Sequence, residues 1–216
     1  MNDCYAGSVE LFGLAGGAVF SVPVTSFAER RFKTVYKQQY DFSCGSAALA
    51  SLLTYHYDDL VNEQTVFVDM YKNGDQQKIQ KLGFSLLDMK LYLERRGYVA
   101  NGFKIDLDGL VKANAPAITI INNKGYLHFV IIKGVSEDEV LIGDPAAGVK
   151  VIPREEFVSM WENRILFLIH DKFDTADNHF QDKKEWALRT KAPLELAVDR
   201  ESLARFQLFL PGKWDF

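Results

Sequence analysis

Cysteine is scarce in this chain of 216 residues, which contains only Cys4 and Cys44. Two cysteines cannot supply the framework of a disulfide-dense miniprotein or a four-cysteine zinc site, although one bridge between them stays open. The histidines are also few, and no metal-binding spacing links them: His56, His128, His170 and His179. The sequence therefore predicts neither a metal site nor a cofactor.

An excess of positive charge and a long apolar run are absent as well. The chain carries 25 Lys and Arg against 29 Asp and Glu, a net charge of −4, which removes the usual electrostatic reason to expect nucleic-acid binding. No apolar run reaches the roughly 18 residues that a membrane-spanning helix needs. The content of 48% hydrophobic residues is ordinary for a folded protein, and the length suits one domain with an appendage.

The N-terminal part of the sequence has features of both a folded segment and a secretion signal. Residues 11–28 are apolar and end in small residues, as they would at a signal cleavage site. However, no Lys or Arg precedes this stretch, whereas Asp3 and Glu10 do. We therefore interpret residues 1–32 as an N-terminal extension that starts irregularly.

Two kinds of periodicity divide the centre of the chain. Small residues recur at helical spacing over 44–57, which predicts a closely packed helix that begins at or beside Cys44. Further helices are expected over residues 63–73, 85–96 and 154–162. Short β-branched segments between Asn and Gly predict antiparallel strands over residues 98–104, 117–122, 126–135, 138–143, 149–152 and 165–169. Because helices precede the strands, we expect an α+β fold rather than alternating βαβ units.

Cys44 is the first candidate for chemistry, because it stands in SCGSAAL at the start of the expected helix. The partial positive charge at a helix N-terminus favours a thiolate there. The neighbouring Gly and Ala residues would let another chain approach the sulfur. The alternative is that Cys44 is a small, inert core residue.

A cysteine nucleophile needs a base and a group that orients this base. His128 is the best base, although its strand GYLHFVIIKGV places it on one face with Val130 and Ile132, as a core histidine would be. Asp144 follows the next strand in VLIGDPAAG, where a simple turn role is the alternative. Since a short turn joins the two strands, they should pair antiparallel and bring His128 near Asp144.

The other histidines are weaker candidates. His56 lies twelve residues after Cys44 on the same expected helix, so it cannot reach the thiol and is expected on the helix surface. His170 and His179 lie in or near a polar C-terminal stretch. None of the three is expected to act as a base.

Two glutamines precede the cysteine, Gln38 by six residues and Gln39 by five. A side-chain amide at either position could donate a hydrogen bond to an oxyanion, beside the backbone N–H of Cys44. Ordinary surface polarity is the simpler interpretation of both when the residues are considered alone.

Three segments of this sequence together resemble a known family: QQYDFSCGSAALASLL, YLHFVIIKGV and IGDPAAG are similar to the signature segments of C39 peptidases. These are papain-like cysteine endopeptidases that cut leader peptides after a double glycine. The likeness covers about residues 33–170 and implies a papain-like α+β domain, with N-terminal helices packed on an antiparallel sheet. The regions 1–32 and 171–216 are then N-terminal and C-terminal extensions.

The resemblance also implies roles for individual residues. It makes Cys44 the nucleophile, His128 the base and Asp144 the acid that orients it. Gln38 becomes the oxyanion donor, because the family's glutamine stands six residues before its cysteine. Ser43 is a departure, since many members carry an acidic residue at that position.

The expected partners follow from the same resemblance. The sequence shows no ATPase or transmembrane region, which implies a stand-alone member, and its flanks are similar to C39-like proteins encoded with Gram-negative fibre and functional-amyloid secretion systems. The expected substrate is a secreted protein or leader peptide, such as a fibre subunit, with a secretion channel as a further partner. The expected location is the periplasm, with the cytoplasm as the alternative. An apolar patch at Leu203, Phe206, Phe209 and Leu210 is expected to dock on the domain.

Two other activities fit parts of this pattern. A C39-like module could bind a secretion substrate without cutting it, but the joint presence of a cysteine, a histidine, an aspartate and a glutamine at the matching positions favours the peptidase. A papain-type acyl transferase would share the same triad and differ only in its acceptor.

One last hypothesis concerns the chain's own N-terminal extension. Residues 10–17, ELFGLAGG, resemble a double-glycine leader. We expect this segment either to occupy the protein's own substrate groove or to be cut after Gly17. A chance match of a glycine-rich apolar segment is the alternative.

Overall fold

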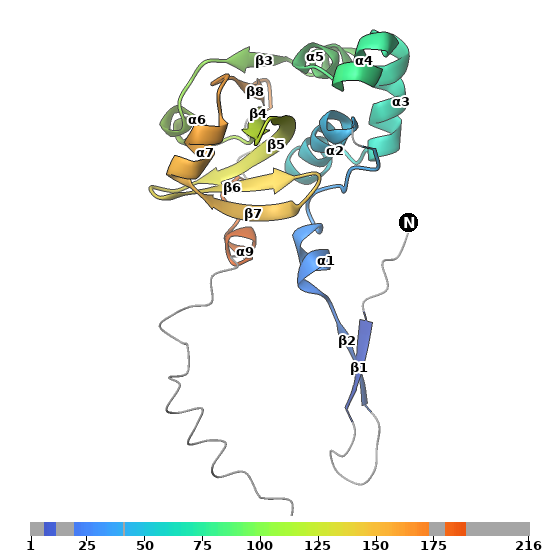
Figure 1. Cartoon of the computed structure of the whole chain (residues 1–216), viewed down its shortest axis with the longest axis vertical. Helices are drawn as coiled ribbons and strands as arrows, with labels where there is room; N and C mark the ends of the chain where they lie inside the picture. Colours follow the sequence, from blue (N-terminus) through green and yellow to red (C-terminus); the bar gives the residue numbers. More distant parts are fainter. Residues whose placement is uncertain (1–6, 12–19, 41, 173–179, 189–216) are drawn as a thin grey trace, which may run out of the picture.

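The structure is a computed structural model, and it describes residues 7–11, 20–40, 42–172 and 180–188. Several sequence predictions concern residues outside these ranges: Cys4, His179, the candidate cut after Gly17 and the apolar patch at residues 203–210. The described part shows a domain of helices and one large sheet, with a β-hairpin before it (Figure 1).

The helices and strands follow the chain in this order: β1 (Gly7–Leu11), β2 (Phe20–Val24), α1 (Phe27–Arg31), α2 (Cys44–His56), α3 (Glu63–Asn73), α4 (Gln76–Leu82), α5 (Leu86–Arg95), β3 (Ala100–Phe103), α6 (Leu107–Ala113), β4 (Ala117–Asn123), β5 (Tyr126–Val135), β6 (Glu139–Asp144), β7 (Gly148–Pro153), α7 (Arg154–Met160), β8 (Leu166–Ile169) and α9 (Lys183–Trp186). The predicted order, with helices before the sheet, is confirmed. Among the described residues, no helix combines the length and the apolar character that crossing a membrane would require.

The large sheet has six strands in the order β3-β8-β4-β5-β6-β7, and its neighbouring strands pair antiparallel. Helix α2 packs against β4 and β5, while α3 and α5 pack against α2. Helix α7 packs on β4, β6 and β7. This arrangement places the start of α2 beside the central strands of the sheet.

Helix α2 runs through the core rather than along its surface. Every residue of the helix except Tyr55 is buried, which its small Ala, Gly and Ser side chains permit because they allow close packing on all sides. The predicted close packing is confirmed. The expectation of a surface position for His56 is wrong, since its exposed fraction is 1%: a helix surrounded by other elements has no solvent face.

The short helices α4 and α6 were not predicted from the sequence, and neither were α1 and α9. Helices α4 and α6 each begin at an aspartate whose side chain accepts a backbone N–H three residues on, Asp75 from Lys78 and Asp106 from Gly109. Such caps satisfy N–H groups that the first helical turn leaves without partners. The longer α5, expected over residues 85–96, is capped by Ser85, which forms a capping box with Asp88.

The N-terminal hairpin pairs β1 with β2, so that Leu11 lies opposite Phe20. It extends away from the six-stranded domain, to which α1 connects it (Figure 1). Glu10 and Leu11 therefore lie in a strand and not in a groove of the domain. Cleavage after Gly17 stays a prediction.

The short segment 180–188 packs against strand β5. The Gln181 side chain donates a hydrogen bond to the Val135 carbonyl at 2.8 Å, and its backbone N–H donates to the Lys133 carbonyl at 2.9 Å. Phe180 is buried. Part of the chain beyond residue 170 is thus attached to the strand that carries His128, while the limits 1–32, 33–170 and 171–216 stay predictions.

Candidate active site

Cys44 is the first residue of α2, and its thiol is free and almost buried, with an exposed fraction of 7%. The preceding Ser43 provides no side-chain cap for this helix. Its hydroxyl instead accepts the Tyr40 N–H at 3.1 Å. The first N–H groups of a helix have no acceptor within the helix and carry partial positive charge. Negative charge on or near the Cys44 sulfur would be stabilised at this end.

His128 lies early in β5, with an exposed fraction of 5%, and faces two partners. Its Nε2 atom is 2.6 Å from Oδ1 of Asp144. Its Nδ1 atom is buried and makes no hydrogen bond. The Cys44 thiol interacts with the same imidazole ring. The ring therefore lies between a carboxylate and a thiol, as a cysteine nucleophile, its base and an orienting acid require.

The charges around His128 favour its protonated form. Burial alone would lower the pKa of His128, but the hydrogen bond to Asp144 and the negative charges of Asp144 and Cys44 outweigh burial and raise this pKa to about 9. At neutral pH the ring is thus mainly an imidazolium. A positive ring beside the sulfur stabilises a thiolate.

Asp144 ends β6 and is held as an anion by several donors. Its Oδ1 accepts the backbone N–H of Ala146 at 2.8 Å and that of Ala147 at 3.3 Å, and its Oδ2 accepts Lys150 Nζ at 2.8 Å. Burial would raise the pKa of Asp144, but the bonds and charges of His128 and Lys150 hold it well below its usual range. The carboxylate is therefore ionised at any pH at which His128 could act as a base.

Close approaches between backbone segments bring Gln38 to the turn that follows Asp144. Gly148 has a φ of +79° and lies so near Arg31 that a Cβ atom would be 2.6 Å from the Arg31 Cβ. A Cβ at Gly143 would be 2.8 Å from Val35 Cγ2. The segment after α1 can thus cross β6 and β7 closely, and it ends with the Gln38 N–H donating to the Pro145 carbonyl at 3.0 Å. Gln38 lies next to the turn that follows Asp144.

The model of the Peptidase C39 family matches residues 32–173, well over half of the chain. The chain belongs to this family. It is 39% identical over 173 residues to the probable functional amyloid protease FapD of Pseudomonas fluorescens, a match that covers 80% of this chain and 76% of the relative. The FapD of Pseudomonas aeruginosa is 37% identical over 164 residues, which cover 76% of this chain and 73% of the relative.

A solved structure gives the same result for the fold. The crystal structure of a double glycine motif protease from an AMS/PCAT transporter, in complex with the leader peptide, is 28% identical to this chain with a TM-score of 0.50. The match covers 62% of this chain and 88% of that one. The predicted papain-like α+β fold is confirmed, and the chain is a cysteine peptidase of the C39 type.

Exposed aromatic side chains lie near the site of this C39 peptidase. Tyr126 stands two residues before His128 in β5, on the same face of the strand, and is exposed. The Tyr126 ring stacks near the His128 ring, with their centroids 5.8 Å apart. Tyr40, close to the start of α2, is exposed as well. A bound peptide would find apolar contacts beside the thiol.

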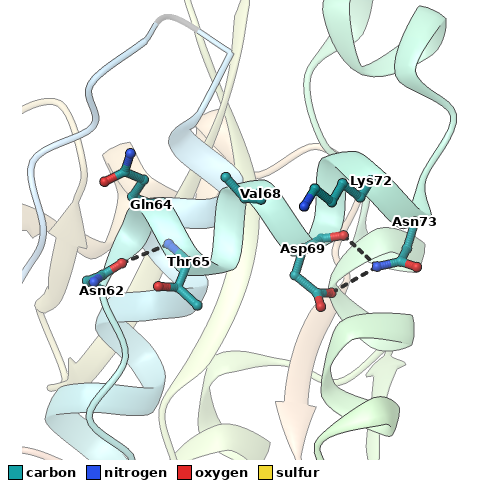
Figure 2. Close-up of a pocket in the computed structure, with 7 residues that line it drawn as sticks. All are labelled: Asn62, Gln64, Thr65, Val68, Asp69, Lys72 and Asn73. Atoms are coloured by element: carbon teal, nitrogen blue, oxygen red, sulfur yellow. Dashed lines mark hydrogen bonds between the residues drawn. The ribbon is translucent and has the colours of Figure 1, made fainter.

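A hollow beside helix α3 is not part of this site. Figure 2 shows its side chains, which all come from Asn62 and helix α3, around a volume of about 420 Å³. Its charged members are Asp69 and Lys72, and Asp69 already binds Arg95 and Asn73. None of the four residues expected to be catalytic lines it.

The structure brings the predicted site residues together. His128 contacts Asp144, as the antiparallel register predicted, and the Cys44 thiol contacts the same ring. Gln39 has an exposed side chain, whereas the Gln38 Oε1 atom is buried without a hydrogen bond. The catalytic roles of Cys44, His128, Asp144 and Gln38 stay predictions at this point. His170 lies elsewhere, bonded to Asn101.

Sequence reasoning missed Lys150, the second partner of Asp144. A signal was available, because the turn at 145–147 makes Asp144 pair with Gly148, and Lys150 then lies diagonally opposite on the same face. Sequence reasoning also did not single out Glu63, which is a buried carboxylate at the start of α3.

We expect Lys150→Met to move the basic limb of the kcat/KM profile upward, by up to about one pH unit. Losing the Lys150 charge leaves Asp144 with one cation fewer beside it, so the carboxylate stabilises the His128 imidazolium more strongly and the pKa of His128 rises. Lys150→Arg should keep the wild-type profile, and folding should be checked by circular dichroism. An unchanged basic limb in Lys150→Met would show that this lysine does not act on the His128–Asp144 pair during catalysis.

Proposed function

We propose that Cys44 is the nucleophile of this peptidase, with His128 as its base and Asp144 as the group that orients the base. The observation that carries this proposal is the His128 ring, which bonds Asp144 through Nε2 and interacts with the Cys44 thiol. Gln38 and the backbone N–H of Cys44 are the proposed oxyanion donors. The position of Gln38 supports this role, because its backbone N–H binds the turn after Asp144 and its Oε1 atom is buried.

The proposed reaction has two steps. The Cys44 thiolate attacks the scissile carbonyl carbon, and the C–N bond breaks as His128 gives its proton to the leaving amine. The product of this step is a thioester on Cys44. Water then attacks the thioester while His128 takes a proton from it, which releases the carboxylic acid and restores the Cys44–His128 pair.

The proposed substrate is a secreted protein or leader peptide of a functional-amyloid system, cut after small residues such as a double glycine. The names of the two FapD relatives support the amyloid setting, and the leader peptide bound to the solved relative supports the type of cut. The exposed rings of Tyr40 and Tyr126 suit a substrate with apolar side chains. We further propose a periplasmic location and a secretion channel as a partner.

Mass spectrometry of the secreted protein encoded beside this gene tests the proposal. Incubation with the wild-type chain should yield two fragments, and the boundary between them should follow a small residue. Incubation with Cys44→Ala should yield no fragments. Gln64→Ala, a change at an exposed residue of α3, serves as a control that should still cut. Binding without cleavage by both wild type and Cys44→Ala would instead support the non-cleaving module.

A further inference from the structure

A buried carboxylate near the thiol has no part in the reaction described above. Glu63 is the first residue of α3 and has an exposed fraction of only 6%. Carboxylates are almost never buried this far without specific partners. Burial raises the pKa of Glu63, and the hydrogen bonds that it accepts counteract only part of this rise.

The partners of Glu63 all belong to the segment around Cys44. Its carboxylate accepts the backbone N–H of Gln39 and the Ser46 hydroxyl, the latter at 3.4 Å, and the Ser43 hydroxyl lies against it. Gln39 is the residue directly after Gln38. A carboxylate from α3 thus holds the backbone on one side of Gln38.

The other side of Gln38 is fixed by a different element. The Gln38 N–H donates to the Pro145 carbonyl, in the turn after Asp144. The segment then returns to α2 through Tyr40, whose N–H donates to the Ser43 hydroxyl. The backbone N–H of Gln39 lies between these two contacts, and it donates to Glu63.

The needs of α3 do not explain this position of Glu63. The helix is already capped by Asn62, whose Oδ1 atom accepts the Thr65 N–H at 2.7 Å. A glutamate in the first turn of a helix already gains a favourable interaction with the helix dipole when it is exposed. Its burial against residues 39–46 therefore needs another reason.

We propose that Glu63 is a positioning residue, which fixes the backbone at Gln39 so that the Gln38 amide points at the oxyanion formed on Cys44. This inference rests on the proposed function, since it requires Gln38 to serve as the oxyanion donor. Glu63 touches neither substrate nor reacting atoms in this role. It acts through the segment that carries Gln38.

Two reagents separate this role from a general effect on the fold. A short peptide ending in glycine aldehyde adds to the thiol: the sulfur bonds to the aldehyde carbon, and the thiol proton moves to the oxygen, which occupies the oxyanion position. Iodoacetamide alkylates the same sulfur without forming an oxyanion. The ratio of aldehyde affinity to alkylation rate, compared between variants with the same peptide, therefore removes the contribution of thiol reactivity.

The experiment uses the full-length chain and compares Glu63→Met and Glu63→Ala with Gln38→Ala. Both Glu63 variants lack a strong acceptor but differ in packing, so an effect that they share belongs to the lost hydrogen bond. We expect each Glu63 variant to weaken aldehyde binding about tenfold or more, as Gln38→Ala also should. The rate of alkylation by iodoacetamide should stay within about threefold of the wild-type rate. Glu63→Gln keeps an acceptor and should rescue binding, and adding Glu63→Met to Gln38→Ala should cost nothing further.

The outcomes separate the role of Glu63 from the proposed function. If Gln38→Ala weakens aldehyde binding but Glu63→Met and Glu63→Ala do not, Glu63 is not a positioning residue and the proposed function stands. If aldehyde affinity and alkylation fall together in the Glu63 variants, its role is structural only, and the inference is overturned. If the wild type binds no aldehyde, the proposed function and this inference both fail.

Discussion

Cys44→Ala and His128→Ala are each expected to lower kcat/KM by about 10⁴-fold or more, and the double variant should be no worse than either one. The non-additivity follows from the geometry, because His128 exchanges protons with the leaving amine and the attacking water only while the intermediate is attached to the Cys44 sulfur. The measurement is hydrolysis of a peptide that spans the cut site, with folding followed by circular dichroism.

Two further variants control this result. Asp144→Asn should keep the fold and lose less activity, since Ala146 and Ala147 can still donate to its remaining oxygen. His170→Ala changes a histidine outside the site and should retain activity. If His128→Ala unfolded the protein while Asp144→Asn had no effect on cleavage, His128 would be a core histidine and not a base.

Glu185→Ala is expected to reduce the free energy of unfolding by about 3–5 kcal/mol, because it leaves a buried charge without its partner. The Lys133 ammonium has a side chain that is 1% exposed and binds Glu185 and Thr34. Burial lowers the pKa of Lys133, and the Glu185 charge opposes this effect. Urea denaturation measures the loss, which corresponds to a drop in Tm on the order of 10 °C.

A compensating pair of changes makes this second prediction specific. Lys133→Met combined with Glu185→Leu removes both charges and should restore most of the stability. Asp108→Ala breaks an exposed ion pair with Arg154 and should cost no more than about 1 kcal/mol. Equal losses in Glu185→Ala and Asp108→Ala would contradict the account of Lys133 as a buried charge that needs its partner.

The longer elements of the fold were predictable because each carries its own periodic pattern. Residues 44–57 and 126–135 were assigned nearly as the structure has them, with α2 at Cys44–His56 and β5 at Tyr126–Val135. Helix α4 was missed, since only Ile79 of its seven residues is buried and no apolar face repeats. Its aspartate cap was the one signal available.

The contacts of the proposed catalytic residues were easier to predict than the residues around them. His128 and Asp144 lie on consecutive strands joined by a short turn, so their contact follows from the register. Glu63 and Lys133 act on residues far away along the chain, and no local pattern shows such partners. His56 was misplaced because a helix that is small and apolar on every side gives no indication of which face is exposed.

The pH dependence of Cys44 alkylation tests the central claim most directly. With reductant present, iodoacetamide should label Cys44 at pH 6 about tenfold faster or more than Cys4, because an imidazolium with a pKa of about 9 stabilises the Cys44 thiolate. In His128→Ala this advantage should disappear, and labelling of Cys44 should rise only near the pH at which ordinary thiols ionise. Equal labelling of both cysteines from about pH 5 to 9 in the wild type would contradict an activated thiol at Cys44.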